Sequence, residues 1–172
     1  NLLIVPSIPE LDPLPPGVTN THYVGALTRQ TVDATHLSAP FDDLPSDRPW
    51  IYVTIGGGAD PVGNRKLFST FNAALEGMPV YAIISTGERF APVELGKPPA
   101  NVRYHQWVPG PAIIARSRGI VFHGGYGTMM EAVRYGVPAV VLPFHSEQEA
   151  NGRRLESVGM AQVLAPDWTS LQ

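Results

Sequence analysis

The fold of this 172-residue chain is decided by one stretch, Gly119-Ile-Val-Phe-His-Gly-Gly-Tyr-Gly-Thr128. An apolar strand at its start runs into a turn with three glycines, and a helix is predicted to follow over Thr128–Tyr135. Glycines let a backbone approach a ligand closely, and a helix N-terminus offers N–H groups with a partial positive charge. His123 adds a ring donor. A merely tight turn would explain one or two of the glycines, so the stretch favours a diphosphate-binding turn.

The same alternation of strand, turn and helix extends to both sides of this stretch. Apolar runs predict strands at Trp50–Ile55, Val80–Ser85, Val102–His105, Gly119–Phe122, Pro138–Leu142 and Met160–Leu164. Helical periodicity and stop glycines predict helices at Pro61–Glu76, Pro111–Arg116, Thr128–Tyr135 and Glu147–Val158. This pattern predicts an α/β fold, a Rossmann-like parallel sheet with helices on both faces. Ligands bind such sheets at the carboxyl ends of the strands.

The first 49 residues differ in character, because eight prolines interrupt them. Short strands are predicted there at Leu2–Val5 and His22–Val24. We therefore expect residues 1–49 to be a Pro-rich crossover segment packed on the domain, and residues 50–172 to form the ligand-binding domain. The chain opens at Asn1 directly on an apolar run, and we interpret it as part of a longer protein.

Composition restricts the possible partners. The net charge of −3 gives no basic field for a nucleic-acid backbone or an anionic membrane. No apolar run reaches the ~20 residues of a membrane span. The chain has no cysteine, which removes thiolate metal sites and suits a reducing cytoplasm. No histidine pair has metalloprotease spacing, and His145-Ser146-Glu147 lacks the cysteines of a zinc deaminase. We expect a cytoplasmic protein without metal or cofactor.

Two familiar phosphate-binding loops do not fit this sequence. A Walker A motif needs lysine after its second glycine, but Gly63 is followed by Asn64. A dinucleotide fingerprint needs a third glycine three residues after Gly127, where Met130 stands. Both motifs are rejected, so the glycine turn belongs to another class of site.

Several polar or aromatic residues near the turns have two interpretations. Glu131 completes a capping box with Thr128, or it accepts hydrogen bonds from the 2′ and 3′ hydroxyls of a ribose. Residues Ser146–Glu149 form a second capping box, or Glu147 and Gln148 hold sugar hydroxyls. Trp107 packs in the core, or its face stacks on a base where the following Pro-rich turn exposes it.

The motifs together resemble the donor-binding signature of family 1 glycosyltransferases, which have the GT-B fold. The closest resemblance is to the bacterial enzymes that act on macrolides and other natural products. The matching residues are Trp107-Val108-Pro109, His123-Gly124-Gly125-Tyr126-Gly127-Thr128, Glu131-Ala132, Gly136-Val137-Pro138, Pro143, Glu147-Gln148 and Asn151, with Trp50–Gly58 as a further match. The resemblance covers the donor-binding, C-terminal half of such an enzyme.

For the nucleotide, the resemblance implies the following site. Trp107 would stack on the base, with the backbone of Val108 contacting it. Glu131 would accept the ribose hydroxyls. His123 would bind the diphosphate together with residues of the glycine turn, namely Gly125, Gly127 and Thr128.

For the sugar, the resemblance implies that Glu147 and Gln148 hold the transferred hexose. Gly57 and Gly58 would line the loop that faces the cleft. The sequence departs from the family pattern at Glu147, where aspartate is usual, and at Gly110, where the plant enzymes often have glutamine.

The implied reaction is inverting transfer of a hexose from UDP or dTDP to the hydroxyl of a small natural product, without a metal ion. The acceptor would be bound mainly by the N-terminal half of the longer protein, which would also supply the base, so the present chain alone is expected to be inactive. Three alternatives stay open: a lipid-linked glycosyltransferase or a nucleotide-sugar 2-epimerase of the same fold, and a noncatalytic nucleotide-sugar-binding module.

Overall fold

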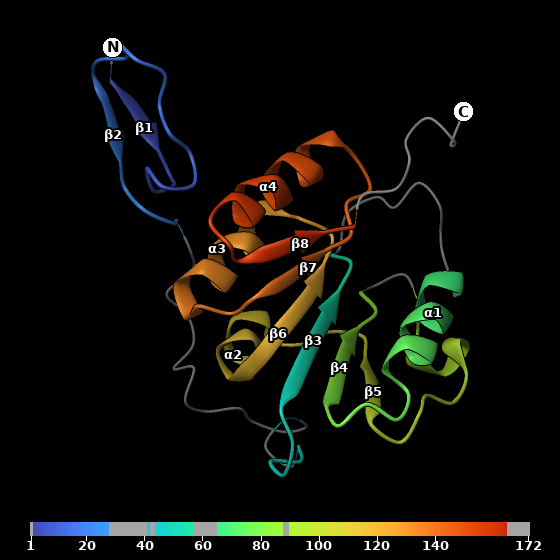
Figure 1. Cartoon of the computed structure of the whole chain (residues 1–172). Coiled ribbons are helices and arrows are strands. Elements are labelled where there is room, and N and C mark those ends of the chain that lie inside the picture. The colour runs from blue at the N-terminus through green and yellow to red at the C-terminus, as the bar shows by residue number, and fades with distance from the viewer. Residues whose placement is uncertain (1, 28–40, 42–43, 57–64, 88–89, 165–172) are drawn as a thin grey trace, which may run out of the picture.

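The computed structural model describes residues 2–27, 41, 44–56, 65–87 and 90–164. Their main feature is a six-stranded, fully parallel sheet with the order β5-β4-β3-β6-β7-β8 (Figure 1). The strands are β3 (Trp50–Thr54), β4 (Tyr81–Ser85), β5 (Val102–His105), β6 (Ser117–Phe122), β7 (Ala139–Val141) and β8 (Ala161–Val163). The predicted Rossmann-like sheet is confirmed, with the strands within two residues of their predicted bounds.

Helices cover both faces of the sheet, as predicted. One face carries α1 (Arg65–Leu75) and the short 3₁₀ helix η1 (Pro92–Leu95), and the other carries α2 (Gly110–Arg116), α3 (Tyr126–Tyr135) and α4 (Ser146–Ser157) (Figure 1). Neighbouring residues of β3 show the division. Tyr52 packs in the core under α2 and α3, whereas Val53 packs in a second core against Phe68 and Phe71 of α1. Alternate side chains of a strand point to opposite faces, so the two cores are separated by the sheet.

The strand order reverses between β3 and β6. From β3 the chain proceeds outward through β4 to β5, and from β6 it proceeds the other way through β7 to β8. In open α/β sheets ligands bind in the crevice outside the carboxyl ends of the strands at such a reversal. Here the residues that follow these two strand ends are Ile55-Gly56 and His123-Gly124-Gly125. The topology therefore brings two glycine turns to one crevice.

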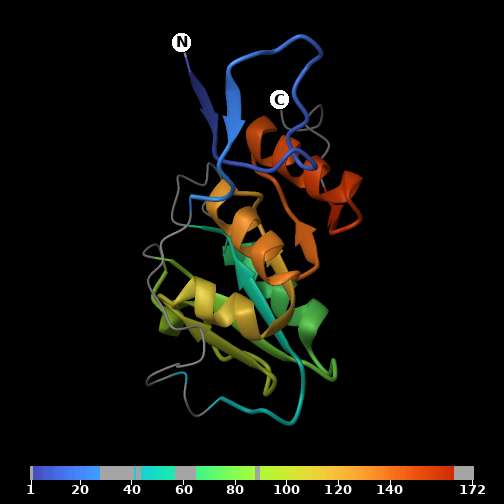
Figure 2. The same cartoon turned by 90° about the vertical axis from the view of Figure 1, so that its left-hand side faces the viewer.

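The N-terminal segment forms a small parallel sheet of its own, from β1 (Leu3–Val5) and β2 (Thr21–Tyr23). The loop between these strands packs on the main body beside α4 (Figure 2). Leu11 of this loop is 3% exposed and joins the core under α2, α3 and α4. The Tyr126 hydroxyl donates a hydrogen bond to the carbonyl of Pro6. These contacts attach the segment to the first turn of α3 and to α4.

The capping-box interpretation is wrong at both helices. Helix α3 begins at Tyr126 after Gly125, and α4 begins at Ser146 after His145, with no side-chain hydrogen bond at either N-cap. Gly125 takes an extended conformation (φ −64°, ψ 136°) that lets the helix start at the next residue. Thr128 therefore lies inside the first turn, where its side chain cannot cap.

No helix among the described residues is long and apolar enough to cross a membrane.

Candidate functional site

His123 follows the carboxyl end of β6 and lies between two glycines. A Cβ atom placed on Gly56 would be 2.6 Å from its Cε1 atom, and one placed on Gly125 would be 2.4 Å from its Nε2 atom. A side chain at either position would displace the imidazole ring. Gly56 also has a φ of +74°, which other residues rarely adopt. The two glycines therefore make room for the ring, and they place its Nε2 edge against the N-cap of α3.

The surroundings of His123 favour an uncharged imidazole. Burial lowers the pKa of His123 below its usual 6.5, while the Thr54 carbonyl and the Glu147 carboxylate raise it and His145 lowers it further. Its Nδ1 atom is buried and forms no hydrogen bond of ordinary geometry with a described residue. An anion bound beside this ring would raise the pKa of His123, because the negative charge favours the protonated imidazole.

The N-terminus of α3 supplies further donors for an anion. The first hydrogen bond of the helix runs from Met129 N–H to Gly125 carbonyl, at 3.0 Å. The N–H groups of the residues before Met129 precede the helical ladder, and those of Gly127 and Thr128 lie in the first turn, where Gly127 is exposed and Thr128 partly exposed. With the partial positive charge of the helix end, they are suited to bind an anion next to His123.

Two cavities flank the β3 residue Tyr52 on the way from this anion site to Trp107. One, of about 690 Å³, is lined by Tyr52, Thr54, Gly56, Ser85, Gly87, Gln106, Trp107 and Val108. The other, of about 350 Å³, is lined by Leu27, Tyr52, Gly110, Pro111, Ile114, Gly127, Thr128 and Glu131. Together they extend from the first turn of α3 to the loop after β5. Tyr52 was not predicted as a site residue, because from the sequence it is an ordinary inward-facing strand position.

Trp107 is 73% exposed at the edge of the larger cavity. The interpretation as a core residue is therefore wrong, and the indole face is available for stacking. The next residue, Val108, is buried in the core under α2. Its backbone thereby places Trp107 at the cavity.

Glu131 lines the smaller cavity and is only 7% exposed. Burial raises its pKa, although Arg134 opposes this at an N–O distance of 4.0 Å. Its Oε2 atom forms no hydrogen bond with a described residue. Buried carboxylate oxygens are normally hydrogen-bonded, so this atom is suited to accept donors from a ligand.

The start of α4 closes the crevice on the far side of the glycine turn. Gly124 has a φ of +94°, and a Cβ on it would lie 2.4 Å from the Gln148 carbonyl oxygen. The Gln148 Oε1 atom accepts a hydrogen bond from Phe144 N–H at 2.8 Å, which leaves its amide N–H₂ as the donating group. Glu147 is exposed, and its Oε1 atom accepts a 2.6 Å hydrogen bond from Asn151 Nδ2. The sequence motif included Asn151, but it gave no indication of this contact.

The predicted site residues thus come together at one edge of the sheet, apart from two. Gly57 and Gly58 lie outside the described residues, and Gly56 marks the described end of their loop. The residues that the structure describes hold no cluster of three or more His, Cys, Asp or Glu that could bind a metal ion.

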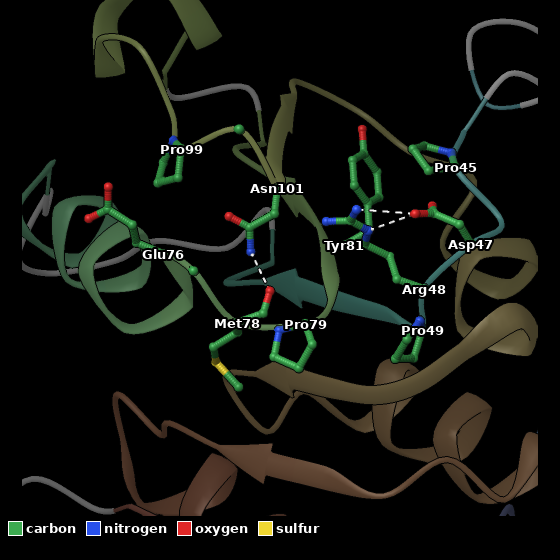
Figure 3. A pocket seen from close by; sticks show the side chains of 12 residues that line it. Pro45, Asp47, Arg48, Pro49, Glu76, Met78, Pro79, Tyr81, Pro99 and Asn101 are labelled. Atoms are coloured by element: carbon green, nitrogen blue, oxygen red, sulfur yellow. Dashed lines mark hydrogen bonds and ion pairs between the residues drawn. The ribbon is translucent and has the colours of Figure 1, made fainter.

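A cavity of about 970 Å³, larger than either of the two above, lies at the opposite end of the sheet, where β3 and β4 begin (Figure 3). Three of its polar side chains, those of Asn101, Arg48 and Asp47, pair with protein groups. Asn101 Nδ2 lies 2.8 Å from the Leu75 carbonyl and 3.3 Å from that of Met78, and Arg48 pairs with Asp47 at 3.1 Å. This cavity contains none of the predicted site residues. We therefore place the functional site at the glycine turns despite the larger volume here.

Comparisons with known proteins show that the chain is similar to glycosyltransferases. Residues 78–170 match the family model of the erythromycin biosynthesis protein CIII-like C-terminal domain. A PGL/p-HBAD biosynthesis glycosyltransferase of Mycobacterium tuberculosis is 36% identical over 121 residues, which is 70% of this chain and 27% of that protein. The calicheamicin glycosyltransferase CalG4 is 28% identical with a TM-score of 0.70, covering 87% of this chain and 36% of CalG4. The glycosyltransferase VinC, solved in complex with dTDP, is 29% identical with a TM-score of 0.59, covering 74% of this chain and 31% of VinC. The chain therefore spans about a third of the length of the proteins it resembles.

Proposed function

The chain belongs to the EryCIII-like C-terminal domain family, and from this premise we propose that it is the nucleotide-sugar-binding half of an inverting glycosyltransferase of the GT-B fold. The donor is a hexose carried on UDP or dTDP, and the acceptor is the hydroxyl of a small natural product. One observation carries the proposal. His123 and the N-terminus of α3 meet at the reversal point of the sheet, where a diphosphate can contact both.

The nucleoside occupies the two cavities that flank Tyr52. The base stacks on the exposed face of Trp107 beside the backbone of Val108. The ribose hydroxyls donate to Glu131, whose Oε2 atom forms no hydrogen bond with a described residue. The dTDP complex of VinC supports a nucleoside diphosphate as the ligand class.

The diphosphate and the sugar extend from there toward α4. The diphosphate accepts hydrogen bonds from His123 and from the N–H groups of Gly127 and Thr128, while Gly125 lets it approach the backbone. The sugar hydroxyls contact the Glu147 carboxylate and the Gln148 amide N–H₂.

In the transfer step the acceptor oxygen forms a bond to the anomeric carbon, and the bond from that carbon to the diphosphate oxygen breaks with its electron pair. Negative charge then develops on the diphosphate. His123 and the helix end stabilise this charge as donors already in place, which is how an electrostatic site lowers a barrier without a metal ion. The acceptor proton passes to a base, and we propose that the base and most of the acceptor site belong to the rest of the longer protein. We place the reaction in the cytoplasm, in keeping with a chain that has no cysteine.

Calorimetric titration of the chain with UDP, dTDP and GDP tests the proposal. We expect at least one of the three to bind, and we expect its nucleoside to bind at least about tenfold more weakly, because the nucleoside lacks the charge-assisted hydrogen bonds of the diphosphate. A chain that binds none of the three nucleotides would contradict the proposal.

A further inference from the structure

We propose that Asp12, Arg154 and Asn151 form a positioning relay that holds the Glu147 carboxylate in place for the transferred sugar. This inference rests on the proposed function, because it assigns the relay to the sugar end of that site. Asn151 is the central member. It is 4% exposed on the second turn of α4, and both polar atoms of its amide are engaged.

The amide nitrogen of Asn151 connects two parts of the site. Nδ2 donates to the Gly124 carbonyl at 2.9 Å and to Glu147 Oε1 at 2.6 Å. An amide N–H₂ has two hydrogens, so both donors are used. Glu147 itself is exposed, and a long exposed side chain samples several rotamers unless a partner holds it. Asn151 is the partner that selects one of them.

The amide oxygen of Asn151 faces a group that can only donate. Arg154 Nη1 donates to Asn151 Oδ1 at 3.1 Å. A guanidinium has no acceptor, whereas the Gly124 carbonyl and the Glu147 carboxylate only accept. The Asn151 amide can therefore satisfy all three partners in one orientation only. The two acceptors require the nitrogen on their side, and Arg154 adds a charge-assisted donor on the oxygen side, so loss of Arg154 weakens the hold on this orientation.

Asp12 anchors the outer end of the relay. Arg154 Nε lies 2.7 Å from Asp12 Oδ1, so the same guanidinium bridges Asp12 and Asn151. Asp12 is itself held by its chain, because its N–H donates to the Ile8 carbonyl at 3.0 Å and its neighbour Leu11 is buried in the core. The N-terminal segment lies beside α4 (Figure 2), and the relay thus couples it to the sugar end of the site.

The position of the diphosphate turn does not depend on this relay alone. The close contact between Gly124 and the Gln148 backbone fixes the turn against α4 independently of any side chain. Loss of the relay should therefore affect sugar binding and leave diphosphate binding largely intact. A merely structural role would affect both equally.

The test compares Arg154→Met with Arg153→Met. Arg153 is the next residue on α4, but it pairs with Glu149 and Glu156 on the same helix, at 3.3 and 2.7 Å, and it has no described contact with the site. Both variants remove one exposed guanidinium, and a thermal melt checks that both are folded. For each, calorimetry gives the dissociation constants of the nucleoside diphosphate and of its glucose conjugate.

For Arg154→Met we expect the conjugate to bind about three- to tenfold more weakly, the range of one hydrogen bond, with the diphosphate changed less than about twofold. Arg153→Met should change neither, and Asp12→Asn should shift the conjugate in the same direction by a smaller factor. Equal losses for both ligands, or identical behaviour of the two arginine variants, would overturn the relay while leaving the proposed function intact. If the unmodified chain binds no nucleotide, the proposed function itself fails, and the relay fails with it.

Discussion

Glu131 shows how one residue can lower stability and support binding. Its buried carboxyl group has a raised pKa in the folded chain, so the folded state binds its proton more tightly than the unfolded state. The stability associated with this proton is present below the unfolded pKa and is lost as the pH rises through the folded pKa. At neutral pH the buried, ionised Glu131 therefore lowers the free energy of unfolding. Hydrogen bonds from a ligand to this carboxylate can offset the loss.

Glu131→Gln removes this charge and should separate binding from stability. We expect nucleoside diphosphate affinity to fall at least about tenfold, because two ribose hydroxyls lose a charged acceptor. We expect Tm at pH 7 to stay equal or to rise by no more than about 4 °C, and this difference to disappear toward pH 4, where Glu131 is protonated.

Glu76→Gln, just past the end of α1, is the matched control for removing a carboxylate, because Glu76 is exposed and remote from the crevice. It should change neither affinity nor Tm. A lower Tm with unchanged affinity for Glu131→Gln would make Glu131 a structural residue only.

Individual site residues could be predicted where they lie together in the sequence. His123 and the glycines form one turn, and their chemistry is visible in residue type alone. The role of Asn151 was hidden, because Gly124 meets it only once α4 packs on the turn, and Asp12 meets its neighbour Arg154 only once the N-terminal segment packs beside α4. Tyr52 was missed for a related reason, since a strand residue lines a cavity only when the sheet order places that strand at the reversal.

At the scale of elements, the glycine turn between β6 and α3 is held by close backbone packing. The two glycines that frame this turn differ sharply in their surroundings. A Cβ on Gly124 would lie 2.4 Å from the Gln148 carbonyl, and its φ of +94° disfavours any other residue, whereas a Cβ on Gly127 would meet nothing within 4 Å. Gly124 is therefore required by close packing against α4, whereas Gly127 leaves the N-terminus of α3 uncovered.

Gly124→Ala and Gly127→Ala should therefore shift stability in opposite directions. For Gly124→Ala we expect the unfolding free energy to fall by more than about 2 kcal/mol, from backbone strain and overpacking. For Gly127→Ala we expect it to rise by up to about 1 kcal/mol, because alanine is the better helix former. Urea unfolding of both variants measures this, and equal stability of the two would contradict the packing described here.

The elements themselves were largely predictable, and their boundaries less so. The strand Val102–His105 was predicted at its observed bounds, because apolar residues lie between a proline-rich loop and a turn. The starts of α3 and α4 were not, because Thr128 and Ser146 resemble N-caps in the sequence while backbone geometry at Gly125 and His145 starts each helix earlier. Local propensity indicates that a helix exists, and the packing of the turn decides where it begins.

At the scale of the whole molecule, we propose that the crevice at the sheet reversal is one wall of a site and that its groups hold a nucleotide and a sugar. The chain spans about a third of the length of the glycosyltransferases it resembles. The division into residues 1–49 and 50–172 stays a prediction. The relay through Asp12 indicates that part of the first segment acts together with the second.

We expect the purified chain to bind a nucleotide sugar without transferring the sugar. Positioning of two reactants can supply roughly 7–11 kcal/mol of barrier lowering, and we propose that half of this positioning comes from the rest of the protein. Mass spectrometry of mixtures with candidate acceptors should show no glycosylated product, under conditions where calorimetry shows the donor bound. Robust multiple turnover would mean that the base lies in this chain.

The central claim is that His123 and the end of α3 bind a diphosphate, and His123→Ala tests it most directly. The measurement compares the best-binding nucleoside diphosphate with its nucleoside, on the unmodified chain and on the variant. We expect the diphosphate to lose roughly 1.5–3 kcal/mol of binding free energy, the worth of a charge-assisted hydrogen bond, while the nucleoside is nearly unaffected. Equal losses for the two ligands, or no loss for either, would contradict the assignment of this turn to the diphosphate.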